Sequence, residues 1–113
     1  MKIIRENICR EDLFLIAENI FDGEMIKAVV DVENGHVAFD AELHADLEQL
    51  LLDQGSRQEH LWGINLYPEE DGEDFIEFDS LINIRPRQDN RSRDVEDPRV
   101  RARIIEVVHQ WIS

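Results

Sequence analysis

The stretch from Asn83 to Arg93 gathers the side chains of this chain that are best suited to recognise an anion. It contains four arginines, two asparagines and one serine. Arginine carries a planar fork of donors that matches carboxylate and phosphate oxygens. With one asparagine from a neighbouring strand, the candidate ligand-binding residues are Asn65, Asn83, Arg85, Asn90, Arg91 and Ser92.

The same stretch also fits a purely structural role. Asn90 suits a turn, and Arg85 can pair with Glu77 or Asp79. The carboxylates at positions 94–97 would repel an anion from the start of the following helix. Arginines gathered in one pocket would favour the ligand site, whereas arginines divided among separate carboxylates would favour the structural role.

Other reactive side chains form no recognisable catalytic or metal-binding pattern. The single cysteine, Cys9, has acidic neighbours, which disfavour the nucleophilic thiolate. The four histidines include no His-x₃-His pair, and His44 is two residues from Glu42 and from Asp46, a spacing that separates helix faces. Phosphate-binding glycine loops and nucleophile elbows are absent. We therefore expect no metal, no cofactor and no catalytic residue, and a non-enzymatic protein is favoured.

Seven elements are expected to position these side chains. Apolar residues recur at helical spacing in three segments and alternate with polar ones in four others. The predicted elements are a helix over 10–22, strands over 25–33 and 36–41, a helix over 41–53, strands over 62–67 and 75–85, and a helix from Pro98 to the chain end.

The two strands that precede residue 41 carry the clearest hairpin signal. Asn34-Gly35 favours a two-residue turn in which both residues have positive φ. Such a turn places Val30 opposite Phe39. One face of the hairpin would then be apolar and the other polar.

The predicted fold class is α+β, with a four-stranded antiparallel sheet and three helices in the order α-β-β-α-β-β-α, in a single domain over 1–113. The helices should cover one apolar face. The outer face should carry Lys27, Asp31, Glu77, Asp79 and Asn83. Gly63 indicates a bulge or a close approach by another group. The expected core comprises Leu47, Leu50, Trp62, Ile64, Phe78, Ile82, Ile104 and Val108.

Charge and hydropathy exclude several classes of partner. The chain has 113 residues, 42% of them hydrophobic, and a formal net charge of −14. An excess of carboxylates disfavours binding to nucleic acid or to an anionic membrane. No apolar run reaches the ~20 residues of a membrane span, and no signal peptide is recognisable, so we expect a cytoplasmic protein.

The charge is divided unevenly along the chain. Residues 1–84 hold 21 acidic and 5 basic side chains, whereas residues 85–113 hold 5 acidic side chains and 7 arginines. Such asymmetry can mark an interaction surface, and it can equally reflect ion pairs within the fold. A protein partner, a second copy of the chain and a small anionic ligand all stay open as partners.

The segments 42–46, 61–68, 81–86 and 90–92 together resemble a family of small prokaryotic proteins of unknown function. This resemblance covers nearly the whole chain and implies a free-standing cytoplasmic domain, with no activity, cofactor or partner attached. Two hypotheses follow. The first is a non-enzymatic protein-binding or self-associating module. The second is a protein that recognises a phosphorylated or nucleotide-like ligand, or an RNA end, through the loop 83–93.

Overall fold

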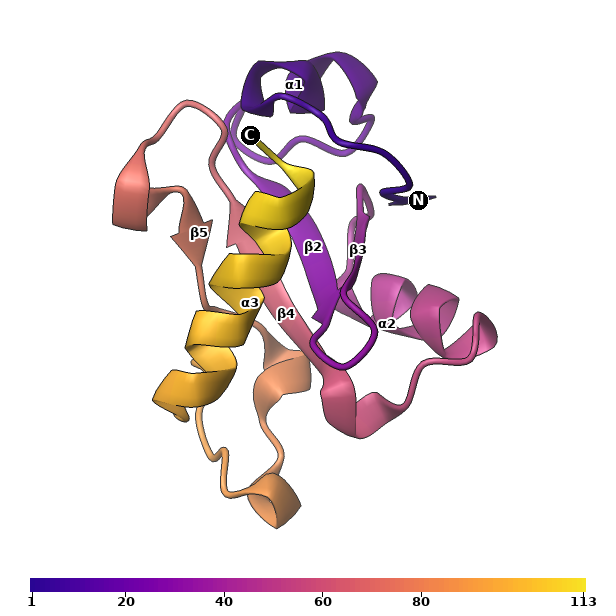
Figure 1. The fold of residues 1–113 in the computed structure, drawn as a ribbon, viewed down its shortest axis with the longest axis vertical. Coiled ribbons are helices and arrows are strands. Elements are labelled where there is room, and N and C mark those ends of the chain that lie inside the picture. The colour runs from indigo at the N-terminus through magenta and orange to yellow at the C-terminus, as the bar shows by residue number, and fades with distance from the viewer.

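The computed structural model, which describes residues 1–113, contains one antiparallel sheet of five strands in the order β1-β3-β2-β4-β5 (Figure 1). The strands are β1 (Lys2–Ile3), β2 (Ile26–Asp31), β3 (His36–Phe39), β4 (Leu61–Leu66) and β5 (Ile76–Glu77). The mixed α and β composition and the antiparallel pairing are confirmed, but the prediction of four strands is wrong. The additional strand is β1, which is too short to show a period of two.

Three α-helices accompany the sheet: α1 (Leu13–Ile16), α2 (His44–Asp53) and α3 (Pro98–Trp111). The start of α3 is as predicted, because the Asp97 carboxylate accepts the N–H of Arg99 at 2.9 Å and proline occupies the first position. None of the helices has both the length and the apolar character that spanning a bilayer requires.

The predicted helix over 10–22 is wrong beyond Ile16. A 3₁₀ turn precedes α1, and Ala17 has extended dihedral angles. The carboxylate of Asp40 accepts the N–H groups of Glu18 and Asn19 at 2.8 and 2.7 Å. Since these N–H groups bond to a side chain far along the sequence, they do not continue the helical ladder.

The prediction that all helices cover one face of the sheet is also wrong. In Figure 1, α3 crosses in front of β2 and β4. Its buried residues join those of α1 in one core cluster, whereas α2 belongs to a second cluster. The second face accepts α2 because it too is apolar: Leu47 and Leu51 of the helix pack with Val29, Ala38 and Leu61. The alternation of side chains along β2 predicted one apolar face and one polar face, so it did not indicate this second apolar face.

Burial departs from the expected pattern at several positions. Asp31 and Asn83, expected on an outer face, are fully buried. Leu50, Phe78 and Ile82, expected in the core, are only partly buried. The other five expected core residues are buried: Leu47, Trp62, Ile64, Ile104 and Val108.

The β2–β3 hairpin has a different register from the predicted one. Val30 lies opposite Val37, not Phe39, so the connection contains four residues. The carboxylate of Asp31 explains this turn, because it accepts the N–H groups of Glu33 and Asn34 at 3.0 and 2.9 Å. A shift of two residues keeps each side chain on its face.

The predicted strand over 75–85 ends at Glu77. The chain then runs irregularly through Ser80, whose hydroxyl accepts the N–H of Ile82 at 3.3 Å and begins a 3₁₀ turn. This early end places the segment 78–96 beside the sheet as a loop.

Candidate functional site

The side-chain amide of Asn83 takes the place of a strand residue at the edge of β4. Its Oδ1 accepts the N–H of Gly63 at 2.8 Å, and its Nδ2 donates to the Gly63 carbonyl at 2.9 Å and to the Arg93 carbonyl at 3.0 Å. Both backbone groups of Gly63 are therefore satisfied on the side of β4 that faces away from β2, where β5 pairs only with Asn65 and Leu66. The side-chain amide of Asn83 thus bonds to backbone groups of the protein through both its oxygen and its nitrogen.

Gly63 is required by a close approach, as one of the two sequence interpretations held. A Cβ atom at this position would lie 2.6 Å from both Cβ and Oγ of Ser80, and 3.2 Å from Cδ2 of His44. His44 is anchored above the strand by a hydrogen bond between its Nε2 and the Ile64 carbonyl, 2.8 Å long. Burial lowers the pKa of His44 and favours the neutral ring.

Asn90 holds the loop 83–96 together. Its Nδ2 donates to the carbonyls of Asn83 and Asp94, both at 2.7 Å, and its Oδ1 accepts the N–H of Glu96 at 2.8 Å. Its backbone also exchanges two hydrogen bonds with the backbone of Arg85. Asn90 therefore does more than occupy a turn: it connects both ends of the loop.

The guanidinium of Arg85 is held by contacts within the protein. It donates to the carbonyls of Gln58 (2.8 Å), Ile82 (3.0 Å) and Leu61, and it lies 4.7 Å from the Trp62 ring centroid. The side chain is 11% exposed. Burial lowers the pKa of Arg85, and the carboxylate of Glu48, 3.7 Å from Nη2, opposes that effect.

The remaining predicted residues do not converge with Arg85 on an open site. The Glu96 carboxylate accepts the Ser92 hydroxyl and the N–H groups of Arg91 and Ser92 at 2.7–2.9 Å, and these hydrogen bonds lower the pKa of Glu96. A carboxylate of the protein thus already occupies these donors. The Arg91 side chain is exposed and has no hydrogen bond or ion pair.

Other arginines are divided among separate carboxylates. Arg93 pairs with Asp79 at 2.5 Å, and Arg101 pairs with Asp94 at 2.7 Å. By the criterion set from the sequence, this division favours the structural role of the loop.

Asn65 shares no hydrogen bond with the other candidate residues. Its Nδ2 donates to Glu77 at 2.8 Å and to the Asp79 carbonyl at 3.3 Å, while its buried Oδ1 has no partner. Burial and the neighbouring Glu77 carboxylate raise the pKa of Tyr67 to about 12. No group of three or more histidine, cysteine or carboxylate side chains is arranged to hold a metal ion.

A hollow between α3 and β5, which sequence reasoning missed, is a second candidate site. Its volume is about 740 Å³. Ile76 and Phe78 line it from the sheet side, and Ala102 and Ile105 line it from the helix. Only the fold brings residues 72–78 beside residues 98–109. One signal was present in the sequence, because Ile105 lies outside the apolar stripe of its helix. In the structure, Ile105 is 39% exposed.

The edge of β5 beside this hollow has unpaired backbone groups. The N–H of Tyr67 donates to the Phe75 carbonyl at 2.9 Å. Because bonded and non-bonded positions alternate along an antiparallel strand, Ile76 directs its N–H and C=O away from β4. The backbone of Phe78 makes no hydrogen bond. The hollow therefore adjoins a short free strand edge.

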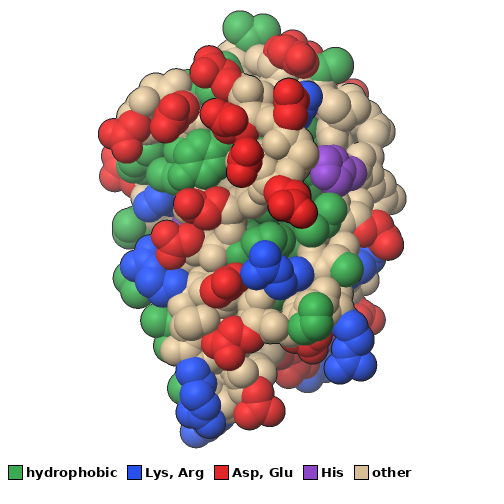
Figure 2. All heavy atoms as spheres, turned by 90° about the vertical axis from the view of Figure 1, so that its left-hand side faces the viewer, with side chains coloured by type: hydrophobic (Ala, Val, Ile, Leu, Met, Phe, Trp, Pro, Cys, Tyr) green, Lys and Arg blue, Asp and Glu red, His purple; other side chains and the backbone are tan.

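The rim of the hollow is acidic. Glu73 and Asp74 line it, are exposed and belong to no ion pair. The guanidinium of Arg101 is occupied, because it bonds to Asp94 and lies 4.3 Å from the Phe78 ring centroid. Figure 2 shows this side of the molecule, where apolar side chains lie among many carboxylates and several arginine or lysine side chains.

Comparisons with known proteins give one match. A family model described as "Protein of unknown function (DUF5674)" matches residues 2–111. No curated protein and no solved structure matches the chain.

Proposed function

The chain belongs to the DUF5674 family, whose function is unknown, and we propose from the site geometry that it is a non-enzymatic module that binds an extended segment of another protein. One observation carries the proposal: the free edge of β5 runs beside a hollow that is apolar at its Ile76, Phe78 and Ile105 side chains, and α3 closes it on the other side. Addition of a strand to a free edge is a common mode of peptide recognition.

The binding mode follows from the alternation of side chains along a strand. The partner segment exchanges hydrogen bonds with the N–H and C=O of Ile76 and extends the sheet by one strand. Every second side chain of that segment then points towards α3. An apolar side chain at this position enters the hollow and packs against Phe78 and Ile105.

Charge selects the sequence around that apolar side chain. Glu73 and Asp74 at the rim attract lysine or arginine, and many further carboxylates lie on this face of the molecule (Figure 2). The partner segment is therefore apolar at alternate positions and basic beside them. The second hypothesis, recognition of an anion by the loop 83–93, has less support, because Arg85 is occupied by carbonyl groups.

Selection from a random peptide library displayed on phage tests the proposal. We expect enriched peptides to alternate apolar residues with lysine or arginine. In a ¹⁵N-labelled protein, a synthesised peptide should shift the amide signals of Ile76, Phe78 and Ile105. It should also slow hydrogen exchange at the Ile76 amide, which is unpaired in the free protein.

A matched pair of variants makes the test specific. Ala102→Arg fills the hollow, and it should weaken peptide binding by at least about tenfold. Ala45→Arg makes the same change at an exposed position of α2 and should leave binding unchanged. Failure to enrich any peptide, or enrichment of peptides that shift only signals of the loop 83–93, would contradict the proposal.

A further inference from the structure

The opposite edge of the sheet, at β1, also has free backbone groups. The N–H of Ile4 donates to the Val37 carbonyl at 2.9 Å, so the alternation of bonded positions turns the N–H and C=O of Ile3 away from β3. The backbone of Arg5, just beyond β1, makes no hydrogen bond within the chain. The charged side chains of Arg5 and Glu6 have no hydrogen bond or ion pair within the chain. Backbone and side chains at this edge thus have unused bonding capacity.

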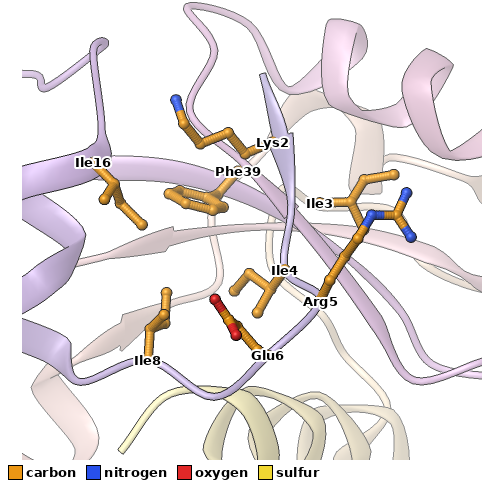
Figure 3. A pocket seen from close by; sticks show the side chains of 8 residues that line it. All are labelled: Lys2, Ile3, Ile4, Arg5, Glu6, Ile8, Ile16 and Phe39. Atoms are coloured by element: carbon orange, nitrogen blue, oxygen red, sulfur yellow. The ribbon is translucent and has the colours of Figure 1, made fainter.

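Two hollows of about 280 and 260 Å³ flank this edge. Around the first, Figure 3 shows the apolar side chains of Ile4, Ile8, Ile16 and Phe39, with Glu6 beside them. The side chains of Ile3 and Arg5 point to the other side of the strand.

We propose that β1 pairs with β1 of a second copy of this chain, in antiparallel orientation about a two-fold axis at Ile4. Ile3 then lies opposite the partner's Arg5 and exchanges two hydrogen bonds with it, and the symmetry repeats this pair. Lys2 lies opposite the partner's Glu6. The two five-stranded sheets become continuous across the axis.

Self-complementarity of the segment Lys2–Glu6 argues for a second copy as the partner. A two-fold interface requires that a residue and its contact exchange roles across the axis. In the register centred on Ile4, both outward-facing residues are paired and two pairs of opposite charges are formed. Centring on Ile3 places Arg5 opposite Met1, and centring on Arg5 places two arginines opposite each other, which is repulsive.

A lysine on an edge strand usually prevents strand addition. Here that charge is compensated, because the Lys2 ammonium donates to the fully buried Asp40 carboxylate at 3.0 Å. The ammonium has three donors and Lys2 is 38% exposed, so it can also bond to the partner's Glu6. The proposal is independent of peptide binding, because β5 lies at the other edge of the sheet.

Sedimentation equilibrium tests the association. The protein should form dimers reversibly, and Glu6→Lys should weaken the dimer by about tenfold or more, because two attractive cross-strand pairs become repulsive. Ile3→Pro removes the outward N–H without removing a bond to β3, and it should also yield monomers. Glu11→Lys makes the same charge change at an exposed position outside β1 and should have no effect.

Cross-linking tests the register in a Cys9→Ser background. Proteins with Ile3→Cys and Arg5→Cys, mixed without reductant, should form a disulfide between them, because residues opposite each other have Cα atoms about 5.5 Å apart. Each protein alone should remain uncross-linked. A monomer at roughly millimolar concentration, a dimer unaffected by Glu6→Lys, or efficient linkage of Ile3→Cys to itself would each overturn the proposal.

Discussion

Replacing Arg85 by glutamine separates a structural arginine from a ligand-binding one. The guanidinium makes hydrogen bonds to three backbone carbonyls in two parts of the chain: Gln58 and Leu61 in one, and Ile82 in the other. Glutamine is shorter and has one amide group, so it cannot reach all three carbonyls. Arg85→Gln also leaves the nearly buried carboxylate of Glu48 without its cationic neighbour.

The expected loss of stability follows from these contacts. A hydrogen bond to a charged group contributes about 1.5–3 kcal/mol, and loss of one partner from a buried ion pair costs about 3–5 kcal/mol. Because the ion pair spans 3.7 Å and the side chain keeps 11% of its surface exposed, we expect the lower end, about 3 kcal/mol. For a chain of this length, that loss corresponds to a fall in Tm of roughly 10–15 °C.

Urea denaturation followed by circular dichroism measures this loss, with Arg91→Gln as the matched control. Arg91 is exposed and unpaired, so its replacement should change the free energy of unfolding by less than about 0.5 kcal/mol. Arg85→Lys should recover little of the loss, because an ammonium cannot reproduce the planar fork of donors. Removing the charge of Glu48 as well, in Arg85→Gln with Glu48→Gln, should recover part of it.

An unchanged Tm in Arg85→Gln would refute the structural interpretation. If that variant instead kept its stability and lost a stabilisation by phosphate that the unmodified protein shows, the anion hypothesis would regain its support.

Three other predictions concern stability. Gly63→Ala should cost about 1–3 kcal/mol in denaturation experiments, because the new Cβ would lie 2.6 Å from Ser80. Burial lowers the pKa of His44, so the unfolded chain takes up the proton first and stability should fall as pH drops below the ordinary value of 6.5; His44→Gln should flatten this part of the profile. Burial alone would raise the pKa of Asp40, but hydrogen bonds from Asn19, Lys2 and Glu18 outweigh it and lower the pKa. Its stabilising contribution should therefore be complete above the ordinary value of 3.8 and be lost at lower pH, and acid titration of Asp40→Asn should lack that loss.

Local patterns in the sequence were sufficient where a residue interacts with its neighbours in the chain. The start of α3 depends on Asp97 and Pro98, which act within one helical turn, and its prediction is confirmed. The apolar face of the β2–β3 hairpin also follows from alternation alone, since Ile26, Ala28 and Val30 share one core cluster. The close approach at Gly63 was one of two expectations from its place within a strand.

The sequence alone could not reveal contacts between distant segments. The end of α1 depends on Asp40, about twenty residues away, and the end of β5 is followed by a loop held by Asn83 and Asn90. These side chains bond to backbone groups that would otherwise continue a helix or a strand. Their partners depend on the completed fold, so propensity and periodicity do not predict them.

Placement of the candidate surfaces was likewise decided by tertiary structure. The chemistry of Arg85 as a multiple donor was evident from its type, but only the fold shows that its acceptors are carbonyls of the protein. The hollow beside β5 joins segments that are about twenty-five residues apart in the sequence. The sequence pattern does not distinguish an apolar side chain in a core from one that lines an open hollow. Its exposure depends on which distant segments cover it, and only the tertiary structure decides that.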